Sequence, residues 1–323
     1  MGARTLQRSP NVLALYARAA APLIPGASAL PFLPGGGGKI PDLELTLGGV
    51  RAKPERVAAY ARVCGFTLRD HLPPTYPQVL AFPLQMAVMA DGAFPFGAVG
   101  LVHIENRIEQ YRPIGVGEEL ELRVRPRELE AHPRGRAFSL LTEVTGGGQT
   151  VWESASTMLH RDGGENGVVA RPGMGEEKGP RGGTAPDGRI APNLVNDFAA
   201  SAEWRLGGDL GRRYAAVSGD RNPIHLHSLS AKAFGFPGAI AHGMWTKARC
   251  LAALEGRLPD AFAVDARFRR PIVLPAKVEF GNFPEGEEIA FAVRDAERRT
   301  PHLEGRIRPL NLAPNAGGRE GTR

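Results

Sequence analysis

The segment Tyr214–Asp220, with the sequence YAAVSGD, repeats an earlier segment, Tyr60–Phe66, with the sequence YARVCGF, at a distance of 154 positions. Two further segments, Arg112–Ile114 and Arg270–Ile272, both read RPI and lie 158 positions apart. Similar offsets in the same chain order indicate a duplicated domain. The length of 323 residues agrees, because it predicts two domains of about 150 residues each.

Both halves of the chain show the same order of predicted elements, judged from apolar periodicity and turn residues. In the first half we predict helices over 54–64 and 76–90 and strands over 100–110, 118–125, 136–144 and 150–160. In the second half we predict helices near Tyr214, over 228–234 and over 242–255, and strands over 262–270, 276–280, 288–294 and 302–308. A strongly apolar helix followed by an antiparallel meander predicts an α+β fold in which a sheet wraps around a helix.

Glycine and proline mark the boundaries between these units. The chain contains 41 Gly and 28 Pro, more than the usual shares of about 7% and 5%, and nine of the glycines fall within 161–190. Such a composition is typical of a flexible linker. We therefore expect a loosely ordered N-terminal extension (1–42), a first domain (43–160), a flexible linker (161–190), a second domain (191–310) and a disordered tail (311–323).

The charge pattern narrows the class of partner. Lysine and arginine number 40 against 34 aspartate and glutamate, a net charge of +6, but the two signs are interspersed along the chain. We find no basic stripe interleaved with aromatic residues, so the sequence predicts no nucleic-acid partner. A modest surplus of arginine suits a small ligand that carries phosphates.

Cysteine usage and hydropathy indicate the compartment. Cys64 and Cys250 lie 186 positions apart with no CxxC motif, which excludes a disulfide framework and a cysteine zinc site. The most apolar stretch, 79–90, has 12 residues, whereas a membrane span needs about 20. We expect a cytoplasmic protein with no transmembrane segment.

The polar segment Ser218–His225, SGDRNPIH, carries the candidate chemistry. Gly219 permits a tight bend and Asn222-Pro223 is a turn signal, so the side chains of Asp220 and His225 can meet across a short loop. A carboxylate and an imidazole that share one water molecule are the parts needed for general acid–base catalysis. The alternative is that Asp220 only caps the turn and His225 is an ordinary polar loop residue.

A second segment, Phe236–Met244, leads into the apolar helix over 242–255. It places the backbone N–H of Gly243 at a helix N-terminus, where partial positive charge accumulates, and glycine leaves room for a ligand carbonyl. Gly243 could therefore form an oxyanion site for a thioester enolate. The alternative is that glycine only allows close packing of the helix on the sheet.

These residues carry a resemblance. Tyr214–His225, with Ala231 six residues further on, resembles the motif of the MaoC-like (R)-specific enoyl-thioester hydratases. From about Leu43 to Leu310 the chain resembles actinobacterial double hot-dog 3-hydroxyacyl-thioester dehydratases, including the stretch Pro74–Pro77. The resemblance implies two tandem hot-dog folds and reversible syn hydration of trans-2-enoyl thioesters of coenzyme A or acyl carrier protein. It also implies that the reaction uses no metal or redox cofactor.

Carried over to this sequence, the resemblance makes Asp220 and His225 the catalytic pair. Asn222 would shape the substrate-binding loop, and the N–H of Gly243 would bind the thioester oxygen. Two other functions remain open, a hot-dog acyl thioesterase and a non-catalytic acyl-thioester binding protein.

The first half departs from this motif. The repeat places Phe66 opposite Asp220 and His71 opposite His225, so the first half lacks the carboxylate and we expect it to be inactive. His71 could be a relic of the duplicated site or an ordinary surface residue. The first half could instead widen an acyl tunnel lined by Phe82, Leu84, Met86 and Met89, although plain core residues are the alternative.

Two arginines and one histidine are weaker candidates. Arg267 and Arg269 lie two positions apart on a predicted strand, on one face, where they could bind the phosphates of coenzyme A or of pantetheine. A solvated strand face is the alternative. His227 forms an H-x-H pattern with His225, but no third ligand is evident and we expect no metal. We expect a pseudo-dimeric monomer or a homodimer, with the site near the junction of the two halves.

Overall fold

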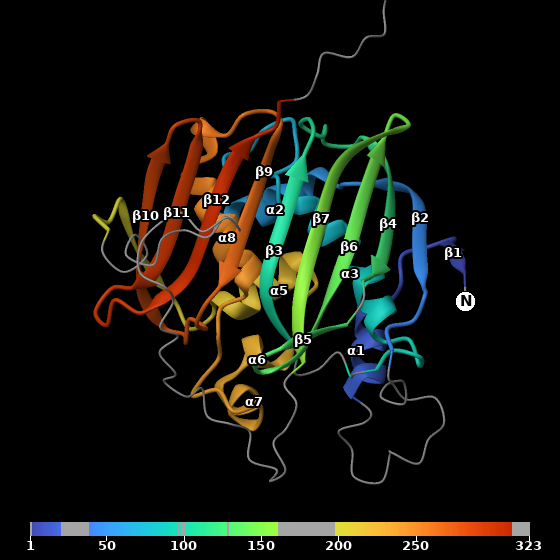
Figure 1. Cartoon of the computed structure of the whole chain (residues 1–323), viewed down its shortest axis with the longest axis horizontal. Coiled ribbons are helices and arrows are strands. Elements are labelled where there is room, and N and C mark those ends of the chain that lie inside the picture. Colours follow the sequence, from blue (N-terminus) through green and yellow to red (C-terminus); the bar gives the residue numbers. More distant parts are fainter. Residues whose placement is uncertain are drawn as a thin grey trace, which may run out of the picture.

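The computed structural model describes residues 2–20, 39–95, 97, 101–127, 129–160 and 198–311. The expected linker 161–190 and residues 312–323 of the expected tail lie outside this part of the chain. Figure 1 shows the strands side by side in one large sheet, with the central helices gathered on one face. No helix among the described residues is long and apolar enough to cross a membrane.

The two halves have matching elements. The first half contains β2 (Glu44–Arg51), α2 (Pro54–Cys64), α3 (Tyr76–Met89), β3 (Val102–Gln110), β4 (Glu119–Pro126), β5 (Glu130–His132), β6 (Gly135–Gly146) and β7 (Gln149–His160). The second contains β8 (Ala202–Leu206), α5 (Leu210–Ser218), α6 (Pro223–Leu226), α7 (Ser228–Ala233), α8 (Gly243–Ala253), the 3₁₀ turn η3 (Glu255–Arg257), β9 (Phe262–Phe268), β10 (Ala276–Glu285), β11 (Glu288–Asp295) and β12 (Pro301–Pro309). The predicted helices and meander strands are present, and the missed elements are mainly the short or edge ones.

Strand order confirms the duplication. The sheet runs β2-β4-β6-β7-β3 in the first half and β9-β12-β11-β10-β8 in the second. Read from opposite ends, the two halves are the same arrangement, which is the double hot-dog fold. They join where β3 pairs antiparallel with β9, in a register that runs from Glu105↔Arg267 to Gln110↔Phe262.

A buried lysine ties the second central helix to this junction. Lys247 of α8 is fully buried, and its Nζ donates to the backbone oxygens of Asn106 and Val264 at 3.0 and 3.1 Å and to Asn106 Oδ1 at 2.6 Å. Asn106 lies on β3 of the first half, and Val264 lies on β9 of the second half. Three acceptors satisfy all three donors of the ammonium group, while burial lowers the pKa of Lys247 well below its ordinary value.

The repeated segment identified in the sequence forms two equivalent helix ends. Helix α2 ends at Gly65 with φ of 85°, and α5 ends at Gly219 with φ of 79°. Both glycines adopt the left-handed conformation that ends a helix at little steric cost. The aromatic rings of Tyr60 and Tyr214 lie 6.0 Å apart, so the two copies meet at the core.

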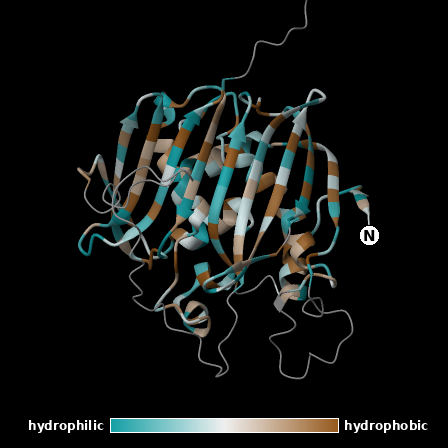
Figure 2. Ribbon diagram, viewed as in Figure 1, coloured by the Kyte–Doolittle hydropathy of each residue, from teal (hydrophilic) through white to brown (hydrophobic). Residues whose placement is uncertain are grey.

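Apolar residues alternate along the strands and face the helices. In β4, Leu120, Leu122 and Val124 are buried while the residues between them are more exposed. Figure 2 shows hydrophobic and hydrophilic residues following one another along the strands. This period of two is the pattern of a sheet with one face packed and the other solvated.

The expectation of a loosely ordered N-terminal extension is wrong for residues 3–20. Strand β1 (Ala3–Leu6) pairs in parallel with β2, and helix α1 (Val12–Ala20) contacts α3. The side chain of Asn11 caps α1 by accepting from the amides of Leu13 and Ala14 at 3.0 and 3.2 Å. Pairing satisfies backbone groups at the edge of the sheet, and the half-buried Leu15 packs against the core.

Replacement of Leu84 by alanine should lower the free energy of unfolding by about 2–5 kcal/mol, because the side chain is fully buried on α3 and its loss leaves a cavity. Denaturant titration measures the change. Leu68→Ala is the matched control. Since Leu68 is 66% exposed, its replacement should change the free energy of unfolding by no more than about 0.5 kcal/mol. Equal losses in the two variants would contradict the burial of Leu84.

Candidate active site

The loop after α5 fixes the position of Asp220. Its carboxylate Oδ1 accepts from the amide of Asn222 at 3.1 Å, and the side chain of Asn222 caps α6 by accepting from Ile224 at 3.4 Å. Asp220 therefore does close the turn, as the simpler interpretation expected. Its side chain nevertheless keeps 30% exposure and lines the pocket described below. Asp220 can therefore close the turn and also face a ligand in the pocket.

His225 presents one free nitrogen. Its Nδ1 lies 2.8 Å from the backbone oxygen of Ile240, and since a carbonyl only accepts, Nδ1 carries the proton. Burial lowers the pKa of His225, although the charge of Asp220 works in the opposite direction. The neutral ring therefore has its lone pair on Nε2, which makes this atom a base.

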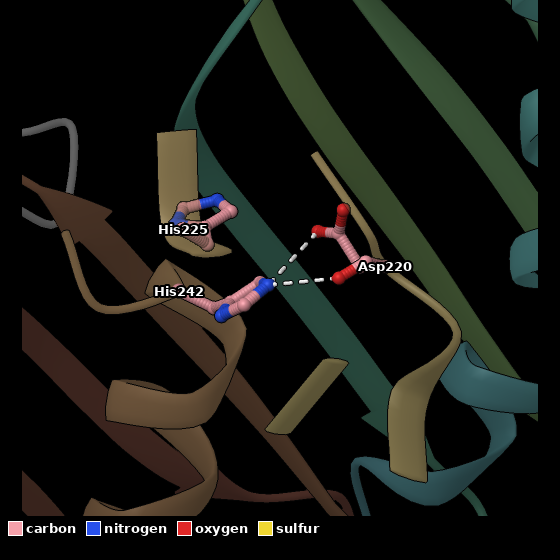
Figure 3. Close-up of side chains that lie close together, drawn as sticks. All are labelled: Asp220, His225 and His242. Atoms are coloured by element: carbon pink, nitrogen blue, oxygen red, sulfur yellow. Dashed lines mark hydrogen bonds and ion pairs between the residues drawn. The ribbon is translucent and has the colours of Figure 1, made fainter. Parts of the chain in front are cut away.

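A second histidine, His242, completes the cluster. Its Nε2 donates to the backbone oxygen of Asp220 at 3.1 Å and lies 3.8 Å from Oδ2 of the same residue (Figure 3). Its ring stacks on that of His225 with the centroids 3.7 Å apart. Burial lowers the pKa of His242 to about 3, so the ring is neutral. No feature of the sequence indicated a role for His242, although it directly precedes Gly243.

Asp220 is held as a carboxylate in this cluster. Burial alone would raise its pKa, but the two imidazoles and hydrogen bonds from Tyr16 and Asn222 outweigh burial and lower it. The site therefore combines an ionised carboxylate with a neutral imidazole at neutral pH. That is the protonation state required to orient a water molecule and to remove its proton.

The three side chains do not fit a metal ion well. Asp220, His225 and His242 can each offer one ligand atom within 4.8 Å of the others. However, Nε2 of His242, its nitrogen nearest the Asp220 carboxylate, carries a proton that it donates to the backbone oxygen of Asp220, so it has no lone pair for an ion held beside that carboxylate. His227 is exposed between α6 and α7 and is not in this cluster.

Gly243 begins helix α8 on the wall of the same pocket. The first N–H groups of a helix have no intrahelical partner and point outward. A Cβ atom built on Gly243 would lie 3.0 Å from the ring of Phe268. Glycine is therefore needed for close packing, and its position on the pocket wall is compatible with an oxyanion role for the N–H.

The pocket extends from this cluster into the first half. One stripe of α3 lines it, made of Gln78, Val79, Phe82, Gln85 and Met89. Of the four residues expected to line an acyl tunnel, Phe82 and Met89 line this pocket, and the expectation holds to that extent. For the other two expected lining residues it is wrong: Leu84 and Met86 are absent from the pocket wall and buried in the core, because the turn of the helix points them away from the stripe.

The two arginines do not share one face, contrary to expectation. The side chain of Arg267 forms an ion pair with Glu105 across the β3–β9 junction, with 2.9 Å between Nε and Oε1. Arg267 does not line the pocket. Strand β9 ends at Phe268, so alternation no longer governs Arg269. Arg269 lines the pocket and pairs with Glu304.

The equivalent position in the first half has no acid–base pair. Phe66 is buried in the core. His71 forms an isolated bridge with Gly115 and is not a lining residue of the pocket. The geometry thus places the cluster of Asp220, His225 and His242 in the second half alone, while α3 of the first half supplies a wall.

Comparison with known proteins gives the family. Residues 198–305 match the family model described as "MaoC like domain". The 3-hydroxyacyl-thioester dehydratase X of Mycobacterium tuberculosis is 36% identical over 287 residues, which cover 88% of this chain and 95% of that protein. The 3-hydroxybutyryl-CoA dehydratase of Methylorubrum extorquens is 39% identical over 88 residues, 24% of this chain and 56% of that protein.

Solved structures agree. The crystal structure of HtdX from Mycobacterium tuberculosis has a TM-score of 0.70 and 35% identity, and the match covers 83% of this chain and all of that one. A MaoC-like dehydratase from Phytophthora capsici has a TM-score of 0.63 at 20% identity and covers 83% of this chain and 95% of its own, which supports the fold. The chain therefore belongs to the MaoC-like dehydratases, in their double hot-dog form.

Proposed function

We propose that this protein interconverts trans-2-enoyl and (R)-3-hydroxyacyl thioesters by reversible syn hydration. The observation that carries the proposal is the pairing of an ionised carboxylate, Asp220, with the free Nε2 of a neutral His225 on the wall of one pocket. The dehydratases that match this chain, named for 3-hydroxyacyl-thioester and 3-hydroxybutyryl-CoA substrates, support the same reaction class.

In the proposed hydration, Asp220 Oδ2 and His225 Nε2 hold one water molecule. His225 takes a proton from this water as its oxygen bonds to C3 of the enoyl group. The electron pair of the C2–C3 double bond moves towards the thioester oxygen, where the N–H of Gly243 stabilises the developing charge. The proton on His225 then passes to C2 from the same face, which restores the neutral imidazole. Dehydration is the reverse sequence.

The proposed acyl site follows the α3 stripe, with Phe82 and Met89 as its apolar contacts. Arg269 lies at the same pocket, and we propose that it contacts the phosphates of coenzyme A or of acyl-carrier pantetheine. In this proposal the reaction needs no metal or redox cofactor, since a proton moves and no electron is transferred. The buried thiols of Cys64 and Cys250 are unpaired, which suits a reducing cytoplasm.

Asp220→Asn and His225→Gln should each lower the rate of crotonyl-CoA hydration by about 10²-fold or more, the scale of a general acid–base group. The loss of ultraviolet absorbance of the conjugated thioester measures the reaction. Circular dichroism and thermal unfolding of the variants provide the control for folding. Rates close to wild type in both folded variants would contradict the mechanism, and release of free coenzyme A by the wild type would favour the thioesterase.

The pH profile of kcat/KM should have its acid limb below pH 6.5. Because the pKa of His225 is lowered from 6.5, the imidazole stays neutral at pH 6.5 and above, and hydration falls only as it becomes protonated at lower pH. His242, with a pKa of about 3, does not titrate in this range. An acid limb centred above pH 6.5 in a constant-ionic-strength buffer series would contradict this assignment.

Phe82→Ala should raise the ratio of kcat/KM for octenoyl-CoA over crotonyl-CoA by about 10-fold or more, because it enlarges the acyl pocket. The ring of Phe82 would lie 3.7 Å from a Cβ atom built on Gly219, so it adjoins the catalytic loop. Leu84→Ala is the matched control, since it truncates the same helix on the core side and should leave the ratio unchanged. The same ratio in both variants would argue against an acyl site along α3.

A further inference from the structure

A tyrosine from the N-terminal segment reaches the candidate active site. Tyr16 of α1 places its hydroxyl 2.6 Å from Oδ1 of Asp220, a residue 204 positions later in the chain. Because an ionised carboxylate only accepts, the phenol is the donor. Burial and the charge of Asp220 raise the pKa of Tyr16 far above its ordinary value, so the phenol keeps its proton across the working pH range.

We infer that Tyr16 is a positioning residue for the reaction, which locks the carboxylate of Asp220 so that one of its oxygens faces the reacting water. This inference rests on the proposed hydratase function and adds the segment that contains α1 to the active site.

The two oxygens of Asp220 have different surroundings. Oδ1 accepts from both the Tyr16 hydroxyl and the Asn222 amide, at 2.6 and 3.1 Å. Oδ2 accepts no hydrogen bond from the described residues and lies 3.8 Å from His242 Nε2. Two donors on one oxygen fix the rotation of the carboxylate about its Cβ–Cγ bond. The other oxygen is thereby left for water.

The tyrosine also contacts the loop that carries Asp220. Backbone amides of Arg221 and Asn222 interact with the phenol oxygen and partly offset the rise in its pKa. Thus one hydroxyl group lies against both the carboxylate and the following turn. A hydrogen bond to an ionised group is stronger than a neutral one, so this contact links α1 to the site through a strong hydrogen bond.

The helix that bears Tyr16 is itself anchored. Strand β1 pairs with β2, the cap at Asn11 fixes the start of α1, and Arg4 lies 3.7 Å from Asp91. The hydroxyl therefore comes from a helix held in place by contacts independent of Asp220. That is the preorganisation expected of a group that supports a catalytic side chain.

The test is Tyr16→Phe in the full chain, which keeps the ring and removes only the hydroxyl. We expect kcat for crotonyl-CoA hydration to fall about 10-fold, the scale of one hydrogen bond to a charged group, with little change in KM. The hydrogen bond from Tyr16 lowers the pKa of Asp220, so its loss raises that pKa, which a carbon-13 NMR titration of labelled aspartate measures.

Leu15→Ala is the matched control, because it weakens the packing of the same helix and leaves the carboxylate contact intact. An unchanged kcat and an unchanged Asp220 pKa in Tyr16→Phe, or equal changes in both variants, would overturn the inference. Carbon-13 NMR of labelled aspartate separates the two proposals. If the Asp220 carboxyl signal shifts in Tyr16→Phe but the wild type does not hydrate enoyl-CoA, the contact stands and the proposed function fails. If the wild type hydrates enoyl-CoA but the signal does not move, the inference about Tyr16 fails alone.

Discussion

The antiparallel pairing of β3 with β9 is the constraint on which the rest of the structure depends. It joins the edges of two five-strand units and makes one sheet from them. Its register brings α3 and α8 to the same face, so the pocket has walls from both halves. Without this pairing the acid–base cluster would have no wall from α3.

Duplication followed by divergence explains the division of labour between the halves. The two helix ends at Gly65 and Gly219 keep the same left-handed geometry, but the residue after each glycine differs. In the first half it is Phe66, which is buried in the core; in the second it is Asp220, which carries the charge of the site. One copy thus keeps the acid–base groups, and the other has become an apolar support and part of the pocket.

Much of the fold could be predicted from the sequence because the local spacing of apolar residues indicates the helices and strands. The predicted helix over 54–64 matches α2, and the meander strands lie close to their expected ranges. Strand β2 was missed because Gly48 and Gly49 interrupt its alternation at a bulge, and β8 because it is a short edge strand. Arg267 was misplaced because β9 ends one residue before the assumed alternation reaches Arg269.

The candidate site also contains some residues that the local sequence predicts and others that only tertiary packing brings in. Asp220 and His225 lie five positions apart within one turn, so their meeting is a local property of the loop. His242 joins them only through the packing of α8, and Tyr16 only through the docking of α1. No local pattern reports a contact of that kind, since it depends on how distant elements pack.

Lys247 limits how far this chain can be divided. Lys247 lies in the second half of the chain, and its ammonium group donates to three acceptors. Two of these acceptors belong to Asn106, in the first half. A fragment with only residues 198–311 would contain the whole acid–base cluster, yet its central helix would bury an amine with one remaining acceptor and its β9 would present an unpaired edge. The region that matches the family model therefore contains one of the three acceptors of its own central lysine. Recombination or truncation at the boundary of the two copies would separate the acid–base cluster from the strand that pairs with β9 and satisfies Lys247.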